Sequence, residues 1–341
     1  MAASSSAAAA ATAASPPVTI QLPRGRGLED LLAATELGPP GRVLDLGGMV
    51  LETRLDTPLT LAPCSPVTIR NGTLRLSGEQ RLLVRGPHAV RLEGVTLLGP
   101  GAMAAGHTHN WLAVKGLVQV AGAGGSLHLA GCTLWGGAHD AVLVADEGGH
   151  LEMSGACVVS GHPGGWGCIV RGEGSHMEAE GATLRDHAWS ALLVGGGGTA
   201  TLIGCQLSGS KVGHGLHVES CSRAVVRRCV MSGNGDAGVY VRGLGGSVEL
   251  TGCQMTGDAH GLHVCGPGSL AIARECSVAG CAGYGVHVLD HGCAEMTGCS
   301  ADSNGGGSFH LAAGSVSSSR LVLAGCTWPP SQPPSPAALV R

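Results

Sequence analysis

The chain has 341 residues, of which 59 are glycine, 14 are cysteine and 8 are aromatic, and its formal net charge is −4. Glycine has no three-residue period, no apolar run reaches the length of a membrane span, and the 20 basic residues are scattered. Collagen, membrane-spanning proteins and nucleic-acid-binding proteins are therefore excluded, and we expect neither a nucleic acid nor a membrane as a partner.

The two ends of the chain differ in composition from the rest. Residues 1–17 are mostly alanine and serine and close with two prolines, which predicts a disordered leader. The leader has no basic residue and no apolar core, so it does not resemble a secretory signal peptide. Its serine content and lack of acidic residues leave a plastid transit peptide as an alternative. Residues 329–341 are expected to form a proline-rich tail.

Ahead of the repeats, residues 27–37 predict a short helix. Leu28, Leu31, Leu32 and Leu37 fall near one face of that helix, which makes it amphipathic. A helix at this point would cover the open edge of the first coil and act as a cap.

From about residue 126 the chain repeats one pattern, as in SLHLAGCTLWG and SVELTGCQMTG. Its segments of alternating polarity are three to five residues long and are separated by Gly, Asn, Asp or Ser, which is typical of strands and turns. Steps of about 24 residues predict one coil of a parallel β-helix per repeat, and about eleven coils in a single domain, 18–328. A longer step between Val95 and Cys132 indicates an insertion near 99–125.

A column of small residues runs through the repeats and is expected to face the interior. Cysteine suits this column because it behaves as a small hydrophobic residue. A disulfide or metal ladder is the alternative, but the sequence has no CxxC pair. Free thiols favour a reducing compartment, so we expect a cytoplasmic protein. We also expect no cofactor and no metal. The column comprises Cys132, Ala156, Ala182, Cys205, Cys229, Cys253, Cys276, Cys299 and Cys326.

The coils, above all SGNGDAGVYVRG at 232–243, resemble the right-handed parallel β-helix repeats of the pectin-lyase-like superfamily. The opening VLDLGG and LTLAPCSPVTIRNGTL resemble the first coil common in that superfamily. The resemblance covers about residues 18–328 and implies an all-β solenoid with right-handed coils. It implies no single activity, because the superfamily includes pectate lyases, polygalacturonases, alginate epimerases and non-catalytic recognition domains.

Few of the superfamily's catalytic motifs are present. A Gly-His-Gly at 213–215 matches one polygalacturonase segment, but the partner segments Asp-Asp, Asn-Thr-Asp and Arg-Ile-Lys are absent, as is the Asp-Pro-His of alginate epimerases. The best catalytic candidates are Asp236 and Asp258, which are expected in nearly equivalent turns of neighbouring coils. His214 and His260 lie in flanking turns and would move protons. Together they would serve a polysaccharide lyase or glycoside hydrolase that acts on uronic-acid polysaccharides.

Two outward columns rich in histidine run beside each other along the repeats. They are expected to continue into an apolar patch at Leu143, Ile169 and Leu193. A solvated strand face, a recognition strip and a metal site all remain open. Stacked imidazoles resist joint protonation, so binding or stability is expected to change near about pH 6. The strip comprises His217, Tyr240, His263, His287 and His310, with Trp166 and Tyr284 beside them.

These patterns favour a monomeric, non-catalytic recognition or scaffold protein that uses the strip to bind a protein or a glycan. The small number of aromatic residues argues against a sugar-processing groove, because such grooves are lined by aromatic side chains. A carbohydrate-active enzyme is the alternative.

Overall fold

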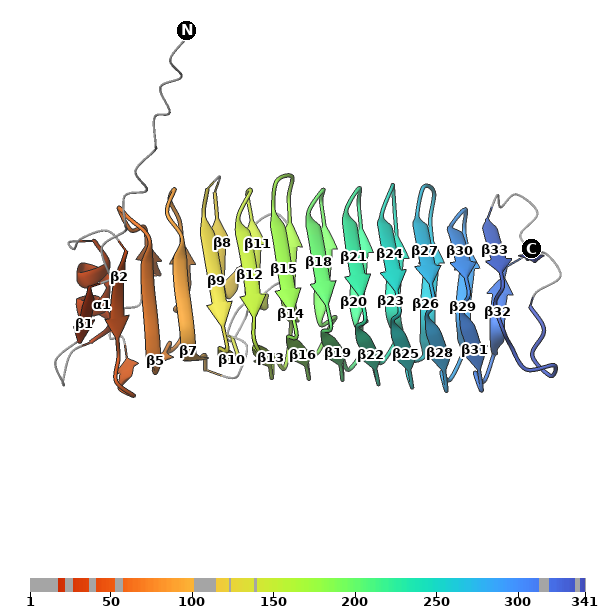
Figure 1. Cartoon of the computed structure of the whole chain (residues 1–341), viewed down its shortest axis with the longest axis horizontal. Coiled ribbons are helices and arrows are strands. Elements are labelled where there is room, and N and C mark those ends of the chain that lie inside the picture. Colours follow the sequence, from red (N-terminus) through yellow and green to blue (C-terminus); the bar gives the residue numbers. More distant parts are fainter. Residues whose placement is uncertain are drawn as a thin grey trace, which may run out of the picture.

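The chain folds into a long rod of stacked coils, as Figure 1 shows. The computed structural model describes residues 18–21, 27–36, 41–52, 58–100, 115–122, 124–137, 140–312, 319–334 and 338–340. Over these ranges nearly all regular structure is β-strand, and the strands form a parallel solenoid with 11 strands in one of its sheets. The expected all-β solenoid of about eleven coils is therefore confirmed.

Each complete coil contains three strands that pair in parallel with their equivalents in the neighbouring coils. An 11-stranded sheet carries one strand of each coil, and a 23-stranded sheet carries the other two as a long ladder and a short ladder. The 11-stranded sheet comprises β4 (Leu59–Leu61), β6 (Leu82–Val84), β8 (Gly116–Ala121), β11 (Ala141–Asp146), β14 (Trp166–Arg171), β17 (Leu192–Gly195), β20 (Leu216–Glu219), β23 (Ala237–Arg242), β26 (His260–Cys265), β29 (Tyr284–Leu289) and β32 (Gly307–Leu311).

The 23-stranded sheet supplies the rest of each coil. In the first coils the two ladders are joined, because β5 and β7 run through both. The long ladder comprises β1 (Thr19–Gln21), β2 (Arg42–Asp45), β5 (Val67–Arg75), β7 (Val90–Leu98), β9 (Ser126–Ala130), β12 (His150–Ser154), β15 (His176–Glu180), β18 (Thr199–Ile203), β21 (Arg223–Arg227), β24 (Ser247–Thr251), β27 (Leu270–Arg274), β30 (Cys293–Thr297), β33 (Arg320–Ala324) and β34 (Leu339–Val340). The short ladder comprises β3 (Val50–Glu52), β10 (Thr133–Trp135), β13 (Val158–Ser160), β16 (Thr183–Arg185), β19 (Gln206–Ser208), β22 (Val230–Ser232), β25 (Gln254–Thr256), β28 (Ser277–Ala279) and β31 (Ser300–Asp302).

A left-handed turn separates the long ladder from the short ladder in the repeated coils. Glycine occupies it in most coils, as at Gly131 with φ 58° and Gly204 with φ 61°. Glycine adopts this backbone without a steric penalty, which explains part of the high glycine content. Arg228 and Glu275 occupy the same turn in two coils, with φ of 52° and 55°.

The inward column of small residues forms as expected, with one correction. The register pairs Thr133 with Val158, so Cys157 and not Ala156 aligns with Cys132. Ala156 is exposed and Cys157 is fully buried, because the turn before this strand takes up one more residue than expected. All 14 cysteines are free thiols. Burial raises the pKa of Cys132 to about 11, which makes this thiol a packing group and not a nucleophile.

The outward column of the 11-stranded sheet is also displaced by one residue at its start. The register aligns Val144, not Leu143, with Ile169, and then with Leu193 and His217. A shift of one residue turns a side chain to the opposite face of a strand, so Leu143 joins the interior. Val144, Ile169 and Leu193 are at most 3 % exposed, so the expected exposed apolar patch is wrong.

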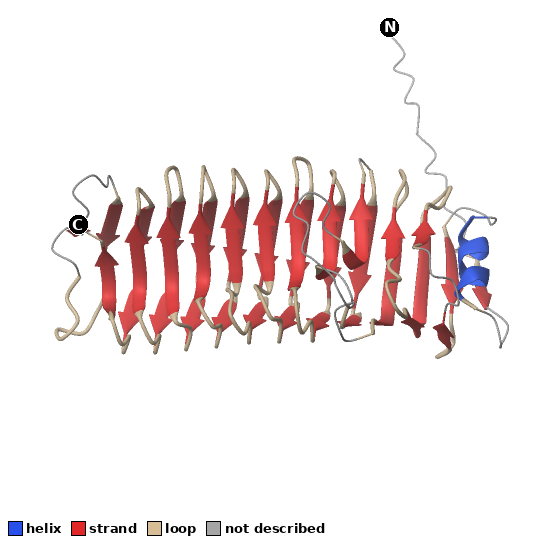
Figure 2. Cartoon of the chain, turned by 180° about the vertical axis from the view of Figure 1, so that it is seen from behind, coloured by secondary structure: helices blue, strands red, loops and turns tan. Residues whose placement is uncertain are grey.

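The N-terminal end of the rod carries α1 (Leu28–Glu36), the helix drawn in blue in Figure 2. Leu31 on this helix is 1 % exposed, and α1 packs beside β4, in the position expected of a cap. The leader 1–17, Leu37 and the insertion residues 101–114 lie outside the described residues. No helix in the described ranges is long and apolar enough to cross a membrane.

The proline-rich segment contacts the last coil. The Gln332 side chain donates a hydrogen bond to the Asn304 carbonyl oxygen over 2.5 Å and accepts one from the Ser308 hydroxyl over 3.0 Å. Further along, Leu339 pairs with Val322 in the long ladder. The segment therefore covers part of the C-terminal end of the solenoid.

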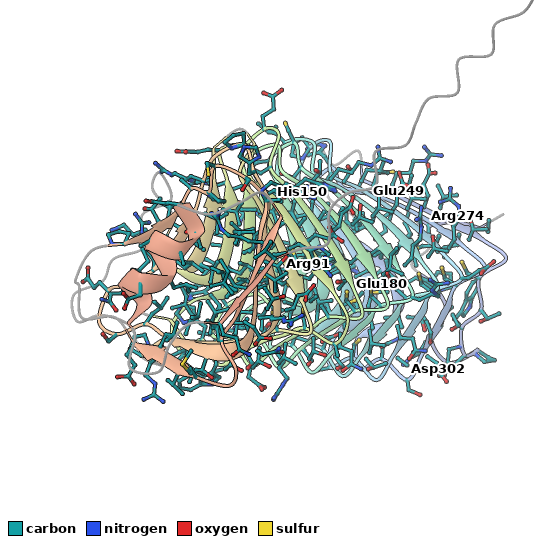
Figure 3. All side chains as sticks on the ribbon, turned by 60° about the vertical axis from the view of Figure 1, so that its left-hand side comes forward. Arg91, His150, Glu180, Glu249, Arg274 and Asp302 are labelled. Carbon is teal, nitrogen blue, oxygen red and sulfur yellow. The ribbon has the colours of Figure 1, made fainter. Side chains whose placement is uncertain are left out.

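The outer face of the 23-stranded sheet is polar. Opposite charges in adjacent coils pair across it, as between Arg75 and Glu52 over 3.0 Å. Such exposed pairs contribute little stability, about 0–1 kcal/mol each. This face has the character of a solvated surface. Figure 3 labels six of its residues, Arg91, His150, Glu180, Glu249, Arg274 and Asp302.

Candidate functional site

A groove of about 540 Å³ opens on the outer face of the 11-stranded sheet. Its side chains come from β14, β20 and β23 and from the turns that precede β17, β20 and β23. The groove therefore gathers groups from four consecutive coils. Its lining residues are Trp166, Trp189, Ser190, Val212, Gly213, His214, His217, Glu219, Asp236, Tyr240 and Arg242.

His214 lies in the groove as a neutral imidazole. Its Nδ1 accepts a hydrogen bond from the Ala237 backbone N–H over 3.2 Å, so the ring proton sits on Nε2. Burial, and next the neighbouring His217, lower the pKa of His214 to about 3. The Asp236 carboxylate lies 3.9 Å from Nδ1, beyond hydrogen-bonding distance. At neutral pH the ring therefore offers an Nε2–H donor.

His217 and Glu219 form a second pair on β20. The Nε2 of His217 lies 3.5 Å from the Glu219 carboxylate, but it is buried without a hydrogen-bond partner, so the two groups are in contact and not hydrogen-bonded. Burial lowers the pKa of His217 to about 3, and the positive charge of Arg242 acts in the same direction. The ring is thus uncharged at neutral pH, and it is a weak base.

Arg242 brings a positive charge to the groove. Its guanidinium has no hydrogen bond or ion pair with any other residue that the structure describes. The five donors of an arginine in such a position are available to oxygen atoms of a ligand. With Glu219 and Asp236 the groove therefore has two carboxylates against one guanidinium.

Two tryptophans form an apolar wall. The rings of Trp166 and Trp189 are stacked, with centroids 5.6 Å apart and an interplanar angle of 22°. Trp166 is buried, whereas Trp189 is 43 % exposed. A large exposed ring held by a second ring is a rigid platform for a flat apolar face.

The histidine strip runs on from the groove along three further coils. The register places His217, Tyr240, His263, His287 and His310 on successive strands, so the expected column exists. Consecutive rings are in contact, with centroids 4.8–5.1 Å apart. The His263 and His287 rings are stacked at 23°, whereas the other consecutive pairs are tilted by 42–52°.

Two further residues of the expected strip lie beside this column. The Tyr284 ring stacks on the His310 ring at 4.1 Å, and Trp166 lies in the groove. Burial lowers the pKa of His263 and of His287 to about 4. Their protonation therefore falls below the pH of about 6 expected from the sequence.

The structure does not pair Asp236 with Asp258. Asp258 aligns with Asn234, because its Oδ1 accepts the Asn234 backbone N–H over 2.8 Å and the Asn234 side-chain N–H over 2.9 Å. Asp258 is 1 % exposed and does not line the groove, while Asp236 does. Of the other two catalytic candidates, His214 lies near Asp236, and His260 lies on a strand beyond the groove. Asp236 and Asp258 do lie in equivalent turns, before β23 and before β26, but at positions two residues apart, so their carboxylates do not face each other.

The two carboxylates that do line the groove are also far apart along the strands. Glu219 pairs in register with Arg242, which follows Asp236 by six positions. At about 3.3 Å per residue the two backbones are separated by about 20 Å. Glycosidases hold their catalytic carboxyl groups about 5–9.5 Å apart on either side of one bond, whereas here each carboxylate lies beside a different histidine, Asp236 beside His214 and Glu219 beside His217.

Three charged or aromatic groove residues were not identified from the sequence, namely Trp189, Glu219 and Arg242. Trp189 comes from a turn, and nothing in the repeat pattern indicates which coils its ring would face. Glu219 and Arg242 follow the strip residues His217 and Tyr240 by two positions, so strand alternation places them on the same face. That alternation is the signal that could have identified them.

A metal site was one interpretation of the histidine columns. In the described part of the chain, no three His, Cys, Asp or Glu side chains are grouped so that they could hold a metal ion. The rings of the strip contact one another instead.

Known proteins share this architecture. The family model for the right handed beta helix region matches residues 116–266 and 166–321, which together span more than half of the chain. No curated protein sequence matches the chain.

Solved structures agree with the family match. The catalytic unit of the thermostable GH87 alpha-1,3-glucanase from Streptomyces thermodiastaticus strain HF3-3 aligns with a TM-score of 0.56 and 13% identity, over 96% of this chain and 73% of that chain. The periplasmic alginate epimerase AlgG aligns with a TM-score of 0.52 and 13% identity, over 95% and 85%. The Dettilon tailspike protein aligns with a TM-score of 0.52 and 13% identity, over 81% and 62%. These likenesses establish the fold, and the family match shows that the chain belongs to the right-handed β-helix family.

Proposed function

We propose that this chain is a recognition protein that binds a glycan in the groove without cleaving it. The observation that carries the proposal is the exposed Trp189 platform, which faces a groove that also contains Arg242, Glu219 and Asp236. A sugar ring has an apolar face that packs on an aromatic ring and hydroxyl groups that hydrogen-bond to charged side chains. The groove offers both kinds of contact side by side.

The charge of the groove favours an uncharged sugar over a uronate. Two carboxylates face one guanidinium, and burial keeps His214 and His217 neutral at physiological pH. A uronate carboxylate would pair with Arg242 but would be repelled by Glu219 and Asp236. Hydroxyl groups, by contrast, can donate to the carboxylates and accept from the guanidinium.

A carbohydrate-active enzyme is the second candidate. The observation in its favour is the contact of 3.5 Å between His217 and Glu219, because a carboxylate that orients an imidazole is a common arrangement for proton transfer. Two solved structures with the same fold, the alpha-1,3-glucanase and the alginate epimerase, are enzymes by name. Against this role, His217 has a pKa of about 3, and the backbones that carry the two groove carboxylates lie about 20 Å apart along the strands.

Binding to purified oligosaccharides tests the proposal. We would titrate the protein by calorimetry with hexasaccharides of α-1,3-glucan, β-1,4-glucan and polygalacturonate, and assay the same mixtures for new reducing ends and unsaturated products. We expect one of the neutral hexasaccharides to bind without turnover, and Trp189→Ala to weaken that binding about tenfold. The matched control is Trp135→Ala, because Trp135 is 42 % exposed but lies on the short ladder.

The outcomes separate the two candidates. Failure of the wild-type protein to bind any of these hexasaccharides would overturn glycan recognition in the groove. Product formation that Glu219→Gln abolishes, with the calorimetric affinity for the oligosaccharide unchanged, would establish the enzyme instead. Equal loss of binding in Trp189→Ala and Trp135→Ala would remove the groove from the proposal.

A further inference from the structure

The pentapeptide HGLHV occurs twice, at 214–218 and at 260–264, two coils apart. Packing explains three of its five residues. In the second copy Leu262 and Val264 are fully buried, and a Cβ at Gly261 would lie 2.6 Å from a carbonyl oxygen of the next coil. The two histidines of the motif face outward instead, so the interior of the solenoid does not require them.

The two copies hold their histidines in the same geometry. The rings of His214 and His217 have centroids 5.1 Å apart at 74°, and those of His260 and His263 have centroids 5.6 Å apart at 61°. As in the first copy, the Nδ1 of the leading histidine accepts a backbone N–H from the next coil, here that of Tyr284 over 3.0 Å. His260 is therefore fixed as an Nε2–H donor, as His214 is.

A third ring from the next coil completes each copy. Tyr240 lies 5.0 Å from His217 in the first copy, and His287 lies 4.9 Å from His263 in the second, between ring centroids. Since the first three rings line the groove, the second three reproduce part of its surface further along the rod. Among the described residues, the Nε2 atoms of His260 and His287 have no hydrogen-bond partner, which leaves them for a ligand.

The second copy lacks the charges of the first. The strand register continues from Arg242 to Cys265 and then to Leu289, so two uncharged residues follow the rings where the first copy has Glu219 and Arg242. Burial keeps His263 and His287 neutral at physiological pH. A carboxylate placed on these rings would lose water without gaining a positively charged partner, which is unfavourable.

We propose that His260, His263 and His287 form a second, uncharged subsite for the same ligand, and that the ligand is a linear chain of neutral sugar units lying along the rod. The inference rests on the proposed function. Strands in neighbouring coils are about 4.8 Å apart, so the second subsite lies about 10 Å from the first. This is close to the length of a disaccharide unit, so a ligand must reach at least two sugars beyond the groove to occupy both subsites.

The length dependence of binding tests the second subsite. We would titrate wild-type protein by calorimetry with α-1,3- and β-1,4-linked gluco-oligosaccharides, from disaccharides to octasaccharides. In the series that binds, affinity rises about tenfold or more between the disaccharide and the hexasaccharide. His287→Ser abolishes this gain and leaves disaccharide binding unchanged, whereas Trp189→Ala weakens binding at every length. His150→Ser is the control, because His150 is a half-buried histidine on the long ladder.

A second variant tests the lack of charge. Leu289→Arg restores a guanidinium at the position that corresponds to Arg242, so it should strengthen the binding of hexagalacturonate about tenfold. The second subsite is overturned if Leu289→Arg leaves the hexagalacturonate affinity unchanged, or if His287→Ser leaves the affinity for the neutral hexasaccharide unchanged. In either case, binding of the neutral disaccharide still supports the groove. No binding of any neutral oligosaccharide overturns the groove and the second subsite together.

Discussion

Asp258 occupies a buried position that suits asparagine, so Asp258→Asn is expected to stabilise the protein. Its equivalents Asn234, one coil before, and Asn304, two coils after, each donate a side-chain N–H to a carbonyl oxygen of the preceding coil, over 3.2 Å in both cases. The Oδ2 of Asp258 takes the place of that donor, and it is buried without a hydrogen-bond partner. Asn234 donates to the carbonyl oxygen of Leu207, and Leu207 pairs in register with Met231. The carbonyl oxygen that faces the Oδ2 of Asp258 is therefore that of Met231.

The magnitude follows from the pKa of the carboxyl group. Burial raises the pKa of Asp258 from 3.8 to about 6, despite two hydrogen bonds from Asn234 that act in the opposite direction. An acid whose pKa is raised by folding destabilises the folded state as the pH rises above the unfolded-state pKa, and the loss is complete above the folded-state pKa. At about 1.4 kcal/mol per pH unit, the loss accumulates between pH 4 and pH 6 and reaches about 3 kcal/mol at pH 7.5. Asparagine removes this loss and adds one hydrogen bond, of about 1 kcal/mol.

Urea unfolding followed by tryptophan fluorescence measures the effect. Asp258→Asn should gain about 3–4 kcal/mol over wild type at pH 7.5 and less than about 2 kcal/mol at pH 4, where the native carboxyl is protonated. The buried histidines act with the opposite sign, because their lowered pKa values make the folded state less stable as the pH falls below 6.5. Comparison with wild type at each pH cancels that contribution. A variant less stable than wild type at pH 7.5, or an equal gain at both pH values, would refute the reasoning.

Three further outcomes are expected. Arg228→Gly should raise the free energy of unfolding by about 1 kcal/mol in the same urea assay, because glycine adopts the left-handed turn without strain. A lower free energy of unfolding in this variant would contradict the reasoning. A maleimide probe should label the exposed Cys64 and Cys221 within minutes in native protein and the inward thiol column only after unfolding, as counted by mass spectrometry. Oligosaccharide affinity should stay constant from pH 8 to pH 5 and fall towards pH 3, because the pKa values of His214 and His217 are about 3. A midpoint near pH 6 in the calorimetric titration would contradict the burial of these two rings.

The coil architecture could be predicted because equivalent side chains recur at nearly constant steps and alternate between two environments. The errors arose where a turn takes up one extra residue, as before Cys157 and at Val144. A single residue of shift reverses the face of every side chain in a strand, and turn length is not encoded in the apolar pattern. The sequence alone therefore identified the column but misplaced its first members.

The candidate site was predicted in part. The ring column from His217 to His310 follows from strand alternation alone. The groove does not, because Trp189 reaches it from a turn whose path depends on packing against Trp166. Asp236 and Asp258 look alike in sequence, since both lie in glycine-containing turns, but one lines the groove and the other is buried. Only the hydrogen bonds within the turns distinguish them.

The parallel register turns the rod into a molecular ruler. Each added coil advances the outer surface by one strand spacing, about 4.8 Å, without altering the chemistry of the coils on either side. The distance between two copies of a ring motif therefore depends only on the number of coils between them. Duplication or deletion of a whole coil between 218 and 260 would change the preferred size of a bound chain in steps of about one sugar unit.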